Sequence, residues 1–247
     1  MLNKINIILT LICLFWNAQR AFPLVEIEST TLDSTLKIND TKASADSIIR
    51  VEYFVDSVNI GQKHKNKIEI TNYQVKDSNY VVINFYSLLE NRLWRLKQTF
   101  NFEKDGLTSC DPLISDFNND NFNDFTYISA IAARMSNEVR RLFIYDNSKD
   151  ELILIKNSED YPNMLYNKQL DCIDAFLIHG GTSTIFLKII GDSLNEFASV
   201  HNSDYRVIYK TDKAGNRTLI RKKKINDEGI WVRYKNYDPL EAYKEKN

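Results

Sequence analysis

Short runs of β-branched and aromatic residues recur along most of the chain and constrain its fold more than any other feature. IIRVEYFV (48–55), KIEITNY (67–73) and NYVVINFY (79–86) are examples. Between such runs lie turn signals such as DNSKDE and KTDKAGN. About ten runs of strand length, mostly joined by short links, predict a largely antiparallel all-β domain.

The later runs continue this pattern to the end of the chain. They are WRLKQTFNF (94–102), DFTYIS (124–129), RLFIYD (141–146), ELILIK (151–156), STIFLKII (183–190), YRVIYK (205–210), TLIRKKKI (218–225) and IWVRYK (230–235). In the run 94–102, alternation predicts one face made of Trp94, Leu96, Phe100 and Phe102.

Helical patterns are few, and no strong sequence repeat is present. A few short helices are expected around Leu88–Leu93, Ser193–Val200 and PLEAYKEK (239–246). Repeated strand–turn–strand units are compatible with propeller-like blades and with a sandwich. We therefore expect a propeller-like or sandwich-like single all-β domain over residues 48–240.

The N-terminus differs from the rest of the chain. MLNK, INIILTLICLFW and NAQ have the layout of a secretory signal peptide, which we place at residues 1–19. A buried N-terminal strand or helix is the alternative. Residues 20–47 are polar, lack periodicity and are expected to form a flexible leader. The protein is thus predicted to be periplasmic or secreted. A lipoprotein acylated at Cys13 is disfavoured by the bulky Ile12 before it.

Removal of a signal peptide would leave Cys110 and Cys172. In an exported protein these two cysteines suit one disulfide bond, but two buried free thiols are equally compatible with the sequence.

Charge excludes one class of partner. The formal net charge is −1, so no basic field is available to recruit nucleic acid. The basic run RKKK (221–224) is expected to be the solvated face of an edge strand.

The most informative polar stretch is ISDFNNDNFNDFTYIS (114–129). Counted from Asp116, it reads D-x-N-x-D-x-x-x-D. Calcium takes six to eight oxygen ligands from carboxylates, amides and backbone carbonyls. The predicted ligands are Asp116, Asn118, Asp120, the Phe122 carbonyl and Asp124. Without a cation these carboxylates would repel one another. An Asx-rich turn with no metal is the alternative.

This loop is not an EF-hand, because Asn121 and Tyr127 stand where that motif needs glycine and glutamate. It resembles the calcium loop of FG-GAP and VCBS repeats, written D-x-[ND]-x-D-G-x-x-D and followed by a strand. Asn121 replaces the usual glycine, and asparagine tolerates the left-handed conformation well.

The resemblance extends to FIYDNSKDELILIKNSEDYPN (143–163), to STIFLKI (183–189) and to the strand-rich C-terminal part. These segments are similar to a family of small exported bacterial proteins. Its best-understood type is a periplasmic calcium-binding inhibitor of peptidoglycan-cleaving, lysozyme-like effectors in xanthomonads. The resemblance covers residues 110–235 and implies an exported all-β protein with one calcium ion. Inhibition of a cell-wall hydrolase is a further hypothesis, because no motif places the contact residues.

A polar cluster follows the loop in ARMSNEVRR (133–141). Such a cluster beside a metal-ordered strand is a candidate surface for an envelope protein such as a peptidoglycan hydrolase, or else an ordinary loop. Its residues are Arg134, Asn137, Glu138, Arg140 and Arg141.

Two short strings resemble motifs of serine esterases, but the residues that should accompany them are missing. GDSL (191–194) resembles the nucleophile block of GDSL esterases, with Ser193 as nucleophile and His201 as base. Ala198 stands where the orienting aspartate of D-x-x-H should be. HGGTST (179–184) is similar to an oxyanion loop, but no G-x-S-x-G accompanies it. A cap of a short helix at Asp192 or Ser193 and a turn at Gly180–Gly181 explain both strings.

Three functions therefore stay open: a calcium-stabilised binding protein, a serine esterase, and a carbohydrate-binding module using surface tryptophan or tyrosine. The three histidines are scattered without a zinc motif. We expect binding rather than catalysis.

Overall fold

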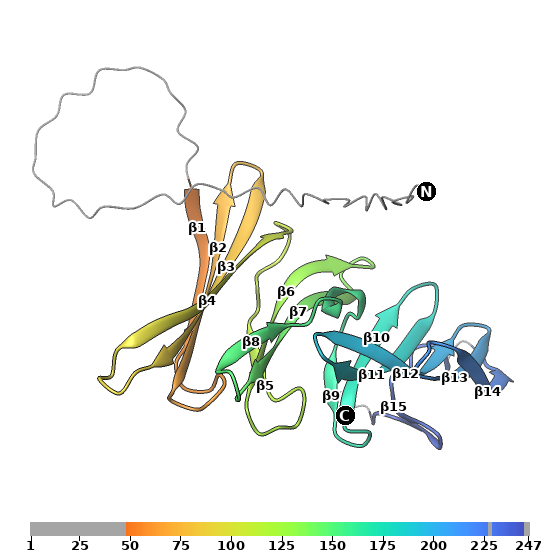
Figure 1. The fold of residues 1–247 in the computed structure, drawn as a ribbon. Coiled ribbons are helices and arrows are strands. Elements are labelled where there is room, and N and C mark those ends of the chain that lie inside the picture. Colours follow the sequence, from red (N-terminus) through yellow and green to blue (C-terminus); the bar gives the residue numbers. More distant parts are fainter. Residues whose placement is uncertain (1–47, 227–228, 245–247) are drawn as a thin grey trace, which may run out of the picture. The chain divides into compact units, whose positions relative to one another are not determined.

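The computed structural model describes residues 48–226 and 229–244. The predicted signal peptide (1–19) and leader (20–47) lie outside the described residues. Within them, the β-rich runs form strands that pair with their sequence neighbours into four antiparallel sheets (Figure 1).

The first sheet has the order β1-β2-β3-β4. Its strands are β1 (Ile48–Asp56), β2 (Asn66–Val75), β3 (Ser78–Leu88) and β4 (Trp94–Lys104). The second sheet has the order β5-β6-β7-β8. Its strands are β5 (Leu113–Ser115), β6 (Asp124–Ala132), β7 (Asn137–Asp146) and β8 (Glu151–Leu154).

The third sheet has six strands in the order β14-β13-β12-β11-β10-β9. They are β9 (Leu165–Asn167), β10 (Cys172–Ile178), β11 (Thr182–Ile190), β12 (Ser193–Asn202), β13 (Tyr205–Thr211) and β14 (Arg217–Lys224). A two-stranded hairpin of β15 (Tyr234–Tyr237) and β16 (Leu240–Ala242) follows. Every residue of the edge strand β14 is exposed, as expected for the RKKK run.

Three apolar clusters hold the sheets together. The first joins inward residues of the first and second sheets, such as Ile83, Phe85 and Phe143. The second joins Leu142 and Ile144 of β7 to the third sheet. The third packs Tyr234 against Phe186 and its neighbours. Face-to-face burial of antiparallel sheets makes this a sandwich-like single domain, as the strand pattern predicts.

The expected helices are wrong. Ser193–Asn202 is strand β12, and Leu240–Ala242 is strand β16. Residues 89–93 form a turn between β3 and β4. Across the described residues, the only named helical element is the 3₁₀ turn Ser158–Asp160. The polar composition of Ser193–Asn202 hid its strand character. Ser199 and Asn202 are buried there by tertiary contacts, which the local sequence does not show.

The predicted face of β4 is also wrong. Phe85 pairs with Gln98 while Tyr86 pairs with Leu96, so Lys97 is an extra residue in a β-bulge. Phe100 and Phe102 therefore pack into the first cluster. Trp94 and Leu96, on the other side of the bulge, lie on the outer face.

Candidate functional site

The acidic loop connects β5 to β6, and Ser115 pairs with Asp124 at its base. Two aromatic residues fix it to the domain. Phe117 is buried in the second apolar cluster, and Phe122 packs edge-on against Tyr145 with ring centroids 5.7 Å apart. The loop is therefore a hairpin connection that packs against the first apolar cluster through Phe122 and against the second through Phe117.

Asp116 organises the turn. Its Oδ1 accepts the backbone N–H of Asn119 at 2.6 Å and of Asp120 at 3.2 Å, and its Oδ2 accepts that of Asn121 at 2.9 Å. Asn121 has a φ of +71°, in the left-handed region that asparagine tolerates well.

Asp124 is the buried member of the loop. Its Oδ1 accepts the Tyr145 N–H at 2.9 Å, and its Oδ2 accepts the Phe117 N–H at 2.7 Å. Burial raises the pKa of this carboxyl to about 7, the two backbone donors oppose the rise, and the charges of Asp120 and Asp116 add to it. Burial and the two neighbouring carboxylates disfavour the charged form of Asp124, so a nearby cation would stabilise that form.

The remaining predicted ligands are more exposed. Asn118 Nδ2 donates to Asp120 Oδ2 at 2.8 Å, and Asp120 Oδ1 accepts the Phe122 N–H at 2.9 Å. Hard oxygen donors of this kind suit calcium. Over residues 48–226 and 229–244, however, no three histidine, cysteine, aspartate or glutamate side chains are grouped so that they could hold a metal ion. The side-chain oxygens of Asp116, Asn118 and Asp120 accept hydrogen bonds from within the loop, whereas Asp124 Oδ1 accepts from Tyr145 on β7.

The predicted partner cluster is divided by the structure. Arg134 is exposed on the turn between β6 and β7, beside Met135, which is 74% exposed. Both residues have positive φ values, as does Ala133. Asn137 is buried, where it exchanges hydrogen bonds with both backbone groups of Ile178.

The arginines of β7 have internal partners on opposite faces. Arg140 is buried and bonds Asp111 and Glu138, at 2.7 and 3.2 Å. Arg141 pairs with Glu159 at 3.0 Å on the other face. Only Arg134 and Glu138 of the cluster are left on the exposed surface.

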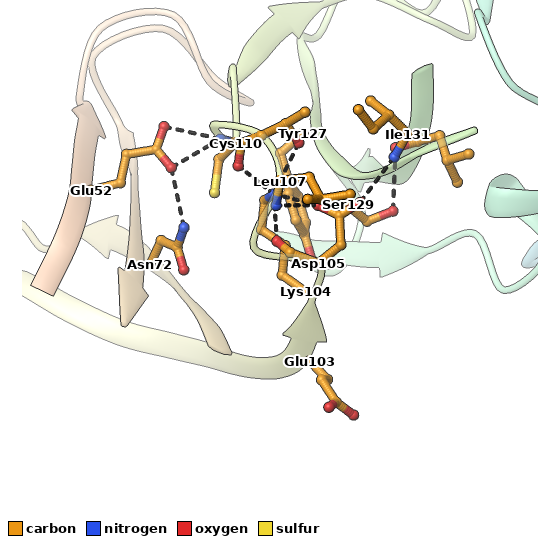
Figure 2. A network of polar contacts seen from close by, with 12 residues as sticks. Glu52, Asn72, Glu103, Lys104, Asp105, Leu107, Cys110, Tyr127, Ser129 and Ile131 are labelled. Atoms are coloured by element: carbon orange, nitrogen blue, oxygen red, sulfur yellow. Dashed lines mark hydrogen bonds and ion pairs between the residues drawn. The ribbon is translucent and has the colours of Figure 1, made fainter. Parts of the chain in front are cut away.

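Cys110 and Cys172 do not form a disulfide, which corrects that possibility. Both thiols are free and buried. Cys110 belongs to the first apolar cluster and Cys172 to the third. Desolvation by burial raises the pKa of each thiol to about 12. Figure 2 shows the backbone N–H of Cys110 donating to both carboxylate oxygens of Glu52, at 2.9 Å each.

The structure separates the predicted esterase pair. Ser193 and His201 lie eight residues apart on β12, about 25 Å at strand spacing. Ser193 Oγ instead hydrogen-bonds Asp192 at 3.2 Å. Gly180 and Gly181 form the turn between β10 and β11, as expected.

His201 belongs to a hydrogen-bond chain that the sequence did not indicate. Ser199 Oγ donates to Glu196, so it accepts from His201 Nε2 at 3.0 Å. His201 Nδ1 then accepts from Ser183 Oγ at 2.7 Å. Burial lowers the pKa of His201, which favours this neutral tautomer. Ser183 and Ser199 are buried, and the exposed His179 lies 2.8 Å from Ser183 Oγ through its Nε2, at the other end of the chain.

Aromatic side chains gather on the outer face of the first sheet. The strand register puts five of them on the side opposite the core: Tyr53, Tyr73, Tyr80, Tyr86 and Trp94. Tyr53 and Tyr80 are exposed, and the Lys67 ammonium lies 4.0 Å from the centre of the Tyr86 ring.

Comparisons with known proteins identify no family for this chain. No protein-family model matches the chain, and no curated protein matches it. Among solved structures, the chain is similar to a Xanthomonas type IV secretion system related protein, with a TM-score of 0.43 and 7% identity. The match covers 73% of this chain and 96% of that chain. A likeness this distant carries no argument about function. In the described part of the chain, no helix has the length and apolar character needed to cross a membrane.

Proposed function

We propose that this protein is an exported binding protein whose 116–124 loop is stabilised by calcium. The observation that supports the metal is the position of Asp124, a fully buried carboxylate with Asp116 and Asp120 beside it. A bound divalent cation would supply the missing positive charge. Asp116, Asn118, Asp120, Asp124 and the Phe122 carbonyl would hold it after their oxygens turn toward one centre, because these carboxylates are not grouped around a common point in the structure.

Thermal unfolding with calcium and with a chelator tests the metal. Calcium should raise the melting temperature, and Asp120→Ala should abolish the rise. Asp212→Ala is the matched control, because Asp212 accepts the same kind of turn bonds, from Ala214 and Asn216, on a different hairpin. Identical wild-type curves with calcium and with chelator would overturn the proposal.

The proposed partner is an envelope protein such as a peptidoglycan hydrolase, bound at the turn of Arg134, Met135 and Glu138. Three successive residues with positive φ hold the tip of this turn, and strained turns with exposed side chains are common at binding sites. A pull-down from envelope extract, with and without calcium, would identify the partner. The rate of peptidoglycan lysis by that hydrolase should then fall as the protein is added. Arg134→Glu should weaken the effect, and an unchanged lysis rate would contradict inhibition.

A carbohydrate-binding module is a second candidate, supported by the outer aromatic face of the first sheet. Tyr53 and Tyr80 are exposed on this face, and each combines an apolar ring with a hydroxyl group that can hydrogen-bond. Affinity electrophoresis in gels containing polysaccharide tests it. Retardation that is lost in Tyr53→Ala and Tyr80→Ala supports this function, and unchanged mobility removes it.

A further inference from the structure

The β13–β14 hairpin concentrates positive charge at one edge of the third sheet. Between Asp204 and Glu228 the sequence has four acidic residues and eight basic ones: Arg206, Lys210, Lys213, Arg217, Arg221, Lys222, Lys223 and Lys224. The whole chain nevertheless has a formal net charge of −1, so the rest of it is acidic. Such an asymmetry is typical of chains that bind an anionic surface.

Five of these cations, here called the basic edge, form no ion pair within the described part of the chain: Lys210, Arg221, Lys222, Lys223 and Lys224. Two neighbours are occupied. Arg217 Nη2 lies 2.7 Å from Glu196 Oε2, and Arg206 donates to the Asn202 side chain. Neither β13 nor β14 contains an acidic residue. The charge of the basic edge is therefore available to an external partner.

The position of β14 exposes this charge on both faces of the sheet. It is the outermost strand, and all eight of its residues are exposed. Lys222 and Lys224 lie on one face, whereas Arg221 pairs with the core residue Ile208 and lies on the other. The outer side of an edge strand also presents unpaired backbone N–H groups. A flat anionic surface against this edge would meet cations from both faces at once, because long basic side chains can reach around the strand.

Exposed apolar side chains accompany the basic edge. Leu219 and Ile220, just before the basic run, are 53% and 41% exposed. Tyr205 is also exposed, and the Lys222 ammonium lies 4.5 Å from the centre of its ring. Lysines alone protect an edge strand from pairing with another chain, so such protection does not account for the exposed aliphatic residues. Cations interleaved with apolar side chains suit the headgroup region of a bilayer, which accepts both.

Trp231 adds an aromatic side chain at the same end of the hairpin. Arg206, which pairs with Lys223 across the two strands, donates from Nη2 to the Gly229 carbonyl at 3.3 Å. Trp231 follows two residues later and is 64% exposed. Tryptophan and tyrosine are enriched where proteins meet the headgroups of a membrane, because their rings are apolar and their polar atoms can hydrogen-bond.

We propose that the basic edge binds the surface of an anionic phospholipid membrane. Its five cations contact phosphate groups, while Leu219, Ile220 and Trp231 enter the boundary between headgroups and acyl chains. A cluster of roughly four to eight basic residues is attracted to such a surface. Nucleic acid offers the same phosphates, but contacts to its backbone make no use of exposed aliphatic side chains. The apolar residues therefore favour lipid.

Vesicle flotation of the whole protein tests the proposal. Vesicles of phosphatidylcholine alone are compared with vesicles that also contain phosphatidylglycerol. The protein should float with the anionic vesicles at about 0.1 M salt and much less at about 1 M, because the Debye length falls from about 10 Å to about 3 Å. The apolar N-terminal run is the same in every variant, so comparison between variants removes its contribution. Equal flotation with both kinds of vesicle would overturn the proposal.

A pair of double variants locates the charge. Lys222→Gln with Lys224→Gln should weaken binding to the anionic vesicles about tenfold or more. Lys63→Gln with Lys65→Gln is the matched control, because it removes two charges at the same spacing from the exposed turn between β1 and β2. The control should bind as the wild type does, and unchanged melting temperatures would show that both variants are folded. Equal weakening in the two would mean that net charge, and not the basic edge, attracts the protein.

A third double variant distinguishes a lipid surface from a soluble polyanion. Leu219→Ser with Ile220→Ser leaves the charge intact, so binding to the anionic vesicles should fall while any binding to a DNA duplex stays the same. Leu107→Ser is its control, since Leu107 is 79% exposed in the loop after β4, and it should change neither. Tighter binding to the duplex than to the vesicles, or vesicle binding that Leu219→Ser with Ile220→Ser does not weaken, would contradict the lipid assignment.

Discussion

Arg233 Nε donates to Asp174 Oδ1 at 2.7 Å, and Arg233 Nη2 donates to the Asp174 carbonyl at 3.0 Å. Asp174 lies on β10 and is fully buried. Asn167 and Tyr243 also donate to its carboxylate. This pair thus links the segment that leads into β15 to the middle of the third sheet.

Arg233→Met should be strongly destabilising. Removing one member of a buried pair leaves the other charge uncompensated, which costs about 3–5 kcal/mol. Lys235→Met is the control, because Lys235 and Glu241 form a half-exposed pair at 3.1 Å worth about 0–1 kcal/mol. Urea unfolding measures both. Equal losses in the two variants would show that Asp174 does not depend on Arg233.

Gly181 should tolerate no side chain. A Cβ there would lie 2.3 Å from the backbone oxygen of Asn202, and backbone cannot move as a flexible side chain can. Gly180, with a φ of +40°, has open space around it. Gly180→Ala should thus cost only the strain of a left-handed residue, about 1–2 kcal/mol, and Gly181→Ala clearly more. The melting temperatures of the two variants test this order. A lower melting temperature for Gly180→Ala than for Gly181→Ala would contradict the close approach of Gly181 to Asn202.

The two buried thiols should be unreactive in the folded protein. Burial raises the pKa of Cys110 and Cys172 to about 12, so almost no thiolate is present at neutral pH. A chromogenic disulfide reagent should react slowly before denaturation and rapidly with two thiols of the domain afterwards. Oxidation should not shift the unfolding curve. Fast reaction of the native protein would contradict the burial of both side chains.

The strands that could be predicted from the sequence are those in which every second residue is apolar and faces the core. Ile68, Ile70, Ile83 and Phe85 are inward-facing residues of this kind. The bulge at Lys97 was not predictable, because it depends on the register with β3 and not on β4 alone.

The candidate site was predictable in part. The spacing from Asp116 identified the turn, and Asn121 adopts the expected left-handed conformation. Burial of Asp124 between Phe117 and Tyr145 depends on tertiary contacts that spacing does not contain.

Acid should destabilise the protein partly through His201. Burial is the main cause of its lowered pKa, the Arg217 charge adds to the effect, and Glu196 opposes it. A histidine whose folded pKa lies below its unfolded value of about 6.5 binds protons more readily in the unfolded chain. Its contribution is fully present above about pH 6.5, and it is lost as the pH falls toward the folded pKa.

His201→Gln should remove that share of the acid sensitivity, because glutamine can both accept from Ser183 and donate to Ser199 without titrating. Melting temperatures measured from about pH 8 down to about pH 5 should fall less steeply in this variant than in the wild type. The control is His64→Asn. His64 is exposed on a turn with a φ of +61°, a conformation that asparagine adopts readily. Equal slopes in His201→Gln and the wild type would mean that other groups carry the acid response. A steeper slope would mean that protonated His201 is stabilised by Glu196 rather than excluded by burial.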